Sequence, residues 1–409
     1  MPELIFVFFL LSGLMKSFLM FFRGNLFAID ITLLLSVLLV GILIVVVFKN
    51  VFFKNQLYIP RFSRAILFTV LIFYLWMITT LLYTLSLHYC WIKVFLFVTD
   101  LLALAFPFLY PSFNPRRFAQ LFAYLGSVLV FGYSILLPGV YDLYLRAAVD
   151  REFVVKYLDV GYIAGIVILL VLFACPRMPR LIKILLAGFN AWVILISAAR
   201  GPLVFLLIVL AIRLMISVFQ AIRKSHLFKT WSVKNLFYIG TGLTILAAAT
   251  YTMLDRYSTL LERSFSRLAQ VTDPASASVA ERVAMISFSF DKIFENASNF
   301  LFGLGIGSFG IVYDNLDGRL YPHNVLLEIG FEMGVIGVLI FLFLILLYGY
   351  KLRHNLNALL ILGYLLLNNL KSYSLIDQRI MFGVISVLVL MEFRNKDKEP
   401  CLRRPETLL

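Results

Sequence analysis

Long runs of apolar residues, separated by short polar or charged connections, recur along nearly the whole chain of 409 residues. Each run is close to the roughly 20 residues that an α-helix needs to cross about 30 Å of hydrocarbon. The pattern predicts an all-α polytopic membrane protein of about twelve spans, forming one bundle over residues 1–409. The predicted spans are residues 3–22, 27–48, 65–86, 90–110, 118–137, 157–175, 181–198, 201–219, 235–253, 333–350, 357–371 and 377–393.

Positive charge is concentrated in alternate connections between these spans. Arg116 and Arg117 lie in one such connection, Lys351 and Arg353 lie in another, and the C-terminal tail is also basic. Cytoplasmic loops carry an excess of Lys and Arg, so both termini are predicted to be cytoplasmic. The opposite side of the membrane then receives two sizeable segments, residues 138–156 and 254–332.

Composition narrows the class of protein. Hydrophobic residues make up 62% of the chain and charged residues 14%, which excludes an ordinary soluble domain with about a quarter of its residues charged. The net charge of +14 does not indicate a nucleic-acid partner, because the cations sit in short loops as topology requires. Cys90, Cys175 and Cys401 are too far apart in sequence to suggest a metal or redox site.

The segment 254–332, inserted between the ninth and tenth spans, is the only long polar stretch. Loops of this length are usually functional or disordered, and its helical periodicity favours order. Arg256, Arg263 and Arg267 fall within about 40° of one another on a helix whose far side is apolar. This basic stripe either rests on lipid phosphates or binds a phosphorylated or acidic substrate.

A second amphipathic helix is predicted from residue 281 to residue 294. Its apolar positions at helical spacing are Val283, Ile286, Phe290 and Ile293. Arg282 stands near its N-terminus, where a cation opposes the helix macrodipole and is poorly placed for stability alone. Arg282 is therefore a candidate functional residue.

Glycines crowd the next part of the loop. Gly305, Gly307 and Gly310 formally match a dinucleotide-binding fingerprint, but no strand–turn–helix unit surrounds them. We expect instead a turn, beginning at Gly303, in which backbone approaches backbone or a ligand closely.

His323 and Asn324 come just before the tenth span. A histidine at a membrane mouth is the side chain best able to exchange a proton near neutral pH. The alternative is an interfacial histidine that merely caps the helix.

Arg200 lies between two apolar spans with almost no loop around it, and Gly201 and Pro202 suit a tight turn. The arginine must sit at the outer membrane boundary, where it either reaches to lipid headgroups or binds an anion between helices. Asp100, in the middle of the fourth span, must be neutral, paired or facing a water-filled cavity.

The first outer segment contains a further group of candidate substrate-binding residues, for which two interpretations are open. Tyr141, Tyr144 and Arg146 could stack on and hydrogen-bond a sugar, or form an aromatic belt at the membrane interface.

Taken in order, these motifs resemble the O-antigen ligase and O-antigen polymerase superfamily of bacterial membrane glycosyltransferases. The residues that carry the likeness are Ser197-Ala-Ala-Arg-Gly201, Arg282, Gly303-Leu-Gly-Ile-Gly-Ser-Phe309 and His323-Asn-Val-Leu-Leu-Glu-Ile-Gly-Phe-Glu-Met-Gly334. One departure is Ala199, where the family more often has Ser before the Arg-Gly pair. The motifs cover roughly residues 195–350.

The resemblance implies a membrane-embedded (GT-C-like) glycosyltransferase fold in the bacterial inner membrane. It also implies a glycan linked through pyrophosphate to undecaprenol as substrate, with chemistry at the periplasmic face. Arg200 and Arg282 would then stabilise the departing pyrophosphate, and His323 would act as general base, giving inversion at the anomeric carbon. Candidate substrate-binding residues are Asn324, the Arg256, Arg263 and Arg267 stripe, Tyr141, Tyr144 and Arg146.

No cofactor is expected. No pair of acidic residues on the outer side suggests a divalent metal site, so we expect the protein to be independent of metal. Expected partners are membrane lipid, the lipid-linked oligosaccharide and a regulator of chain length.

Within the superfamily a polymerase transfers the glycan to another lipid-linked repeat unit, whereas a ligase transfers it to the lipid A core. Glu328 and Glu332 after the histidine look more like the polymerase branch. A third alternative is a transporter or flippase of lipid-linked oligosaccharide, with Arg200 as its anion site. No repeated halves are evident in the sequence, and polar residues gather in one outer loop, which disfavours transport.

Overall fold

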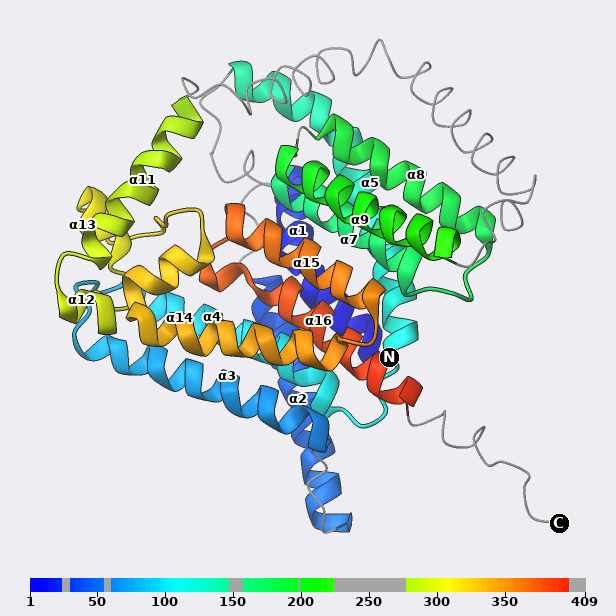
Figure 1. The fold of residues 1–409 in the computed structure, drawn as a ribbon, viewed down its shortest axis with the longest axis horizontal. Coiled ribbons are helices and arrows are strands. Elements are labelled where there is room, and N and C mark those ends of the chain that lie inside the picture. The colour runs from blue at the N-terminus through cyan, green and yellow to red at the C-terminus, as the bar shows by residue number, and fades with distance from the viewer. Residues whose placement is uncertain (24–29, 55–59, 147–156, 198, 224–276, 397–409) are drawn as a thin grey trace.

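A computed structural model describes residues 1–23, 30–54, 60–146, 157–197, 199–223 and 277–396. Every regular element in these ranges is a helix (Figure 1). The α-helices are α1 (Pro2–Arg23), α2 (Ile31–Lys54), α3 (Arg61–Thr79), α4 (Tyr89–Leu109), α5 (Pro115–Arg146), α7 (Tyr157–Phe173), α8 (Arg180–Ile196), α9 (Arg200–Arg223), α11 (Ala277–Ile293), α12 (Ala297–Phe302), α13 (Phe309–Asp314), α14 (Val325–Leu352), α15 (Leu356–Ser372) and α16 (Arg379–Lys396). Short 3-10 helices η2 (Thr80–Leu82) and η4 (Leu375–Asp377) complete the described elements.

The helices account for all but one of the predicted spans. Seven of them in the described part are long and apolar enough to cross a membrane, and Leu158–Phe173 in α7 is a shorter apolar helix. The all-α, multi-pass character is therefore confirmed. The predicted span 235–253 lies outside the described residues, so the number twelve stays a prediction.

The two largest differences from the predicted spans are at the start of α14 and the end of α5. α14 begins at Val325 instead of residue 333, because the Asn324 side chain caps it and accepts hydrogen bonds from the N–H groups of Leu326 and Leu327. α5 continues to Arg146, beyond the predicted end at residue 137, so residues 138–146 of the first outer segment are helical.

Polar contacts between loops hold one end of the bundle together. At the end predicted to be cytoplasmic, Glu3 accepts a hydrogen bond from the N–H of Asn114 at 2.7 Å. At the same end, Arg394 donates to the carbonyl of Pro111 at 2.9 Å. Connections predicted to share a side of the membrane thus lie at the same end of the bundle.

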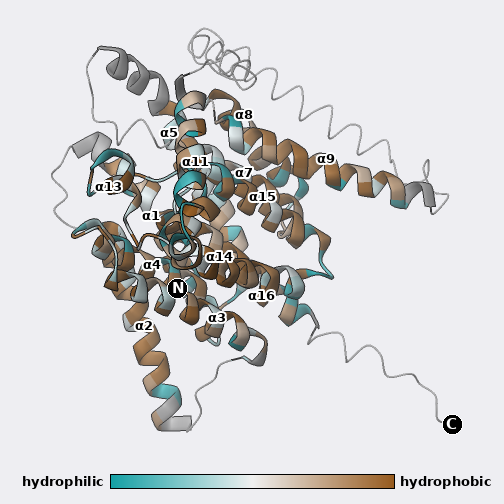
Figure 2. Ribbon diagram, turned by 60° about the vertical axis from the view of Figure 1, so that its left-hand side comes forward, coloured by the Kyte–Doolittle hydropathy of each residue, from teal (hydrophilic) through white to brown (hydrophobic). Residues whose placement is uncertain are grey.

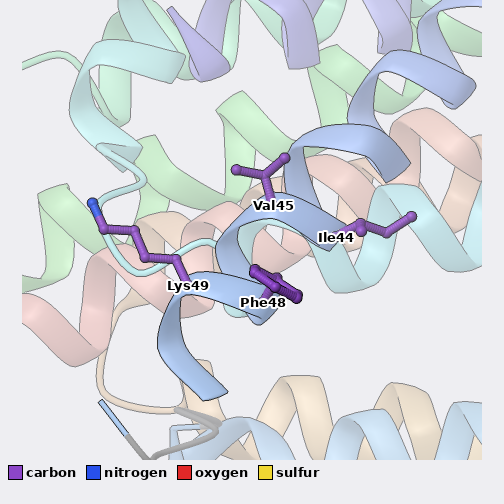
Figure 3. Close-up of a pocket in the computed structure, with 4 residues that line it drawn as sticks. All are labelled: Ile44, Val45, Phe48 and Lys49. Atoms are coloured by element: carbon purple, nitrogen blue, oxygen red, sulfur yellow. The ribbon is translucent and has the colours of Figure 1, made fainter. Parts of the chain in front are cut away.

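Apolar side chains fill the bundle, and many large apolar side chains are also exposed on its surface. Hydrophobic residues run along most of the helices (Figure 2). α2 projects from the bundle and exposes Leu34, Val37 and Val45. A shallow pocket on α2 is lined by Ile44, Val45, Phe48 and Lys49, and it holds no cluster of polar groups for a substrate (Figure 3). An apolar surface of this extent fits lipid contact, not water.

The glycine-rich turn packs against a kink in α14, at Gly334, which has φ 66°. The kink frees backbone carbonyls, and the N–H groups of Leu304 and Gly305 donate to the carbonyls of Phe331 and Glu332 at 2.8 and 2.9 Å. The close approach of backbone to backbone, one of the two expected roles of these glycines, is thus confirmed. Figure 1 shows α11, α12 and α13 gathered at this end of α14.

We predict that Gly303→Ala destabilises the protein by about 3 kcal/mol. Gly303 has φ 77°, and a Cβ there would lie 2.5 Å from the backbone carbon of Glu332, which cannot move aside. Thermal unfolding of the purified protein in detergent measures the effect. Gly349→Ala in α14 is the control, because a Cβ there meets nothing within 4 Å and alanine favours a helix. Equal melting temperatures for the two variants would contradict this account.

Candidate functional site

Arg200 is the first residue of α9 and follows α8, which ends at Ile196, after a tight turn. The start of α7 packs closely on this turn, since a Cβ at Gly161 would lie 2.3 Å from the Cβ of Ala199. The predicted turn between two spans is confirmed. It places Arg200, which is partly buried, at the end of the bundle predicted to be outer.

Arg282 lies in the second turn of α11, also partly buried. The predicted helix is present, but its predicted apolar face is partly wrong. Ile293 is buried as expected, whereas Val283 and Phe290 are 57% and 47% exposed. Met285 instead joins Ile293 on the buried side, where they cluster with Phe309 and Phe331 of the loop and α14.

His323 adopts a left-handed backbone conformation with φ 54°, directly before the Asn324 cap. Its ring centroid lies 4.7 Å from that of Tyr321. The helix cap is therefore Asn324 and not His323, which removes the interpretation of the histidine as a capping residue. The Asn324 side-chain oxygen is occupied by the cap; its role in substrate binding stays a prediction.

His323 is neutral at pH 7 in this site. Burial, and then the positive charge of Arg282, lower the pKa of His323 to about 4, and Arg319 acts in the same direction. A backbone hydrogen bond with Ser372 acts in the opposite direction, more strongly than Arg319 but less strongly than burial and Arg282. Arg319 is itself paired with Asp377 at 2.8 Å, so Arg282 is the less compensated of the two arginines. A neutral imidazole can accept a proton, as a general base must.

The three residues predicted to be catalytic converge at the end of α15. Arg282 acts electrostatically on His323, and both Arg282 and Arg200 act on Lys371 in the last turn of α15. Side chains from α9, α11 and the loop before α14 thus lie within electrostatic range of one another, through Lys371, at the end of the bundle predicted to be outer.

Sequence reasoning missed Lys371, which was treated as the end of a span. A signal was present, because a lysine at the outer end of a span departs from the rule that places basic residues on the cytoplasmic side.

A buried ionic network behind the site was also missed. The Lys93 ammonium, fully buried in α4, pairs with Glu328 at 2.5 Å and with Glu332 at 2.6 Å. Glu328 also accepts hydrogen bonds from the Ser374 hydroxyl at 2.7 Å and the Leu375 N–H at 2.8 Å. Buried charges need such satisfied partners. The network fixes the first turns of α14, and with them His323, to α4 and η4.

Asp317 ties the outer loop to the start of α4. Its carboxylate accepts hydrogen bonds from the Ser86 hydroxyl at 2.6 Å and from the N–H groups of Leu87, His88 and Tyr89 at 3.0, 2.9 and 3.2 Å. Desolvation acts to raise the pKa of Asp317, but the Ser86 and backbone donors outweigh it and lower the pKa to about 2. The carboxylate is a charged cap on the orphan donors of α4.

Asp100 is fully buried, and neither carboxylate oxygen has a hydrogen-bond partner in the described structure. The cation that acts on it most strongly is Arg379, at the start of α16, across a gap too wide for an ion pair.

Several predicted site residues are not placed. Arg256, Arg263 and Arg267 lie outside the described residues, as do the side chains of Tyr141, Tyr144 and Arg146 at the end of α5. Their roles stay predictions. In the described ranges no three His, Cys, Asp or Glu side chains come together as metal ligands. Metal independence remains a prediction, and loss of activity on adding a chelator would contradict it.

No protein-family model matches the chain, and no curated protein matches it significantly.

Proposed function

We propose that this chain is an inverting, metal-independent glycosyltransferase that uses a polyprenyl-pyrophosphate-linked glycan at the outer face of a bacterial inner membrane. The observation that carries the proposal is that Arg282 acts electrostatically on a neutral His323, and that Arg282 and Arg200 both act on Lys371, at one end of an apolar bundle. The resemblance to O-antigen polymerases and ligases supports the same reaction.

The charges favour an anionic substrate. Half-buried cations held near one another repel, and a fold tolerates this when a ligand supplies the opposite charge. Arginine suits phosphate groups because its planar guanidinium donates two parallel hydrogen bonds. The site lies at the outer end of long apolar helices, where a pyrophosphate head could bind while its polyprenyl chain stays in lipid.

The proposed reaction uses His323 as general base. An acceptor sugar hydroxyl attacks the anomeric carbon of the donor, and its proton passes to the imidazole. A new bond forms between that carbon and the acceptor oxygen, while the bond from the carbon to the pyrophosphate oxygen breaks. The leaving group is polyprenyl pyrophosphate, whose developing negative charge Arg200 and Arg282 stabilise. Attack opposite the leaving group inverts the anomeric centre.

Of the two possible acceptors we favour a second lipid-linked repeat unit, which makes the protein a polysaccharide polymerase. The preference rests on the resemblance around Glu328 and Glu332. Both carboxylates are bound to Lys93, so their proposed part is to hold the site in place and not to contact sugar.

Complementation tests this assignment in a strain that lacks the gene, with surface glycan separated on a gel. The parent protein should give a ladder, and His323→Asn or Arg200→Gln should leave one repeat unit on the lipid core. A core without any repeat unit, with polymer accumulating on the lipid carrier, would identify a ligase. His88→Ala, at an exposed histidine of the same outer end, is the control and should restore the ladder. Normal ladders from all variants would contradict the proposed site.

A further inference from the structure

Lys371 lies along the first turns of α9. A Cβ at Gly201 would lie 3.4 Å from the Cδ and 3.6 Å from the Nζ of Lys371. One turn further along α9, the ring of Phe205 lies 5.7 Å from the same Nζ. Residues 201 and 205 share one face of the helix, so the lysine stem runs along that face and its ammonium group lies near Arg200.

The surroundings of this ammonium are positive. The charged groups that act on Lys371 are Arg282 and Arg200, and in the described ranges Lys371 forms no hydrogen bond or ion pair. The N-terminus of α9, a helix of 24 residues, adds its own positive end. Basic side chains of α9 and α11 thus act on a half-buried lysine of α15, and in the described ranges no acidic group acts on Lys371.

A half-buried ammonium that has no hydrogen-bond or ion-pair partner in the described ranges and is acted on by two guanidinium groups favours an anion beside it. A lysine that only reached lipid headgroups would extend away from the bundle, whereas this one packs between α15 and α9. Its stem is also partly buried, so its position is fixed by packing before any ligand arrives.

We propose that Lys371 is a third phosphate-binding residue, which completes a diphosphate site with Arg200 and Arg282. The proposal rests on the proposed function for its substrate, a sugar diphosphate lipid. A diphosphate diester carries two negative charges, and the oxygen released from the anomeric carbon adds a third. Two arginines balance the bound donor, and Lys371 balances the charge that appears as the bond breaks.

The test measures binding of inorganic pyrophosphate to the purified full-length protein in a neutral detergent, by calorimetric titration. Lys371→Gln should weaken binding by about tenfold or more, as expected for one lost charge-assisted hydrogen bond. Lys371→Arg keeps the charge and should bind within a few-fold of the parent. Lys351→Gln, at the opposite end of the bundle, is the matched control and should bind like the parent. Unchanged binding by Lys371→Gln would overturn the proposal.

A second experiment distinguishes a site for a diphosphate group from a site for a lipid headgroup. Nanodiscs of zwitterionic lipid, with or without phosphatidylglycerol, replace the detergent. Pyrophosphate binding that persists in both supports the diphosphate site. Binding that appears with phosphatidylglycerol alone, with no response to pyrophosphate, would overturn it in favour of headgroup binding.

Failure of this inference and failure of the proposed function are distinguishable. If glycosyl transfer needs His323 but proceeds normally in Lys371→Gln, the role of Lys371 is contradicted while the proposed glycosyltransferase activity is supported. If pyrophosphate binding needs Lys371 but the protein transfers no lipid-linked glycan, the anion site is supported and the proposed reaction is contradicted.

Discussion

His323→Asn is expected to lower glycosyl transfer by about 10²–10⁴-fold, because it removes the group that accepts the proton of the attacking hydroxyl. Asparagine is the suitable replacement, since it tolerates the left-handed backbone that His323 adopts at φ 54°. Abundance and melting temperature should therefore stay near those of the parent. Initial rates in proteoliposomes measure the effect, with His88→Ala as control.

The pH dependence of the reaction follows from the pKa of about 4 that His323 has in this site. The free enzyme needs a neutral imidazole, so kcat/KM should be flat near neutral pH and fall as pH drops through that pKa. Bound pyrophosphate offsets the charge of Arg282, which raises the pKa, so the acidic limb of kcat should lie at higher pH. Arg282→Gln should move the limb of kcat/KM upward. A downward shift would contradict the assigned coupling.

Arg200→Gln and Arg282→Gln should each lower kcat by about 10²–10³-fold, as when a group that stabilises developing charge is removed. Lysine should restore only part of the activity at either position, because it cannot donate two parallel hydrogen bonds to one phosphate group. Steady-state kinetics with a saturating donor separate this loss from weaker binding.

The control for Arg282 lies on the same helix. Lys292 is a partly exposed cation of α11 that pairs with Glu295 at 3.1 Å, and Lys292→Gln removes the same charge from the same element. Its kcat should match that of the parent. Equal losses from Lys292→Gln and Arg282→Gln would show a general effect of net charge and contradict a specific site.

The helices of the bundle could be predicted because an uninterrupted apolar run of the right length leaves the backbone no alternative in lipid. The start of α14 could not, since Glu328 and Glu332 look like loop residues until Lys93 is known to neutralise them. That pairing joins positions more than 200 residues apart in sequence, and no local pattern carries it.

The candidate site was predictable in part for similar reasons. Arg200 and His323 stood out because each is a polar side chain at an apolar boundary. The buried face of α11 was partly mistaken, because the helix carries two apolar stripes and periodicity alone does not say which one meets α14. Lys371 was hidden by its place at the end of a span, and only the folded chain brings it to Arg200 and Arg282.

The most direct test of the central claim is a reaction in proteoliposomes that contain the purified protein and one lipid-linked oligosaccharide repeat unit as sole substrate. The account predicts longer lipid-linked glycans and one free polyprenyl pyrophosphate for each bond formed, with both products lost in His323→Asn. Polyprenyl pyrophosphate released at the parental rate by His323→Asn would contradict the account.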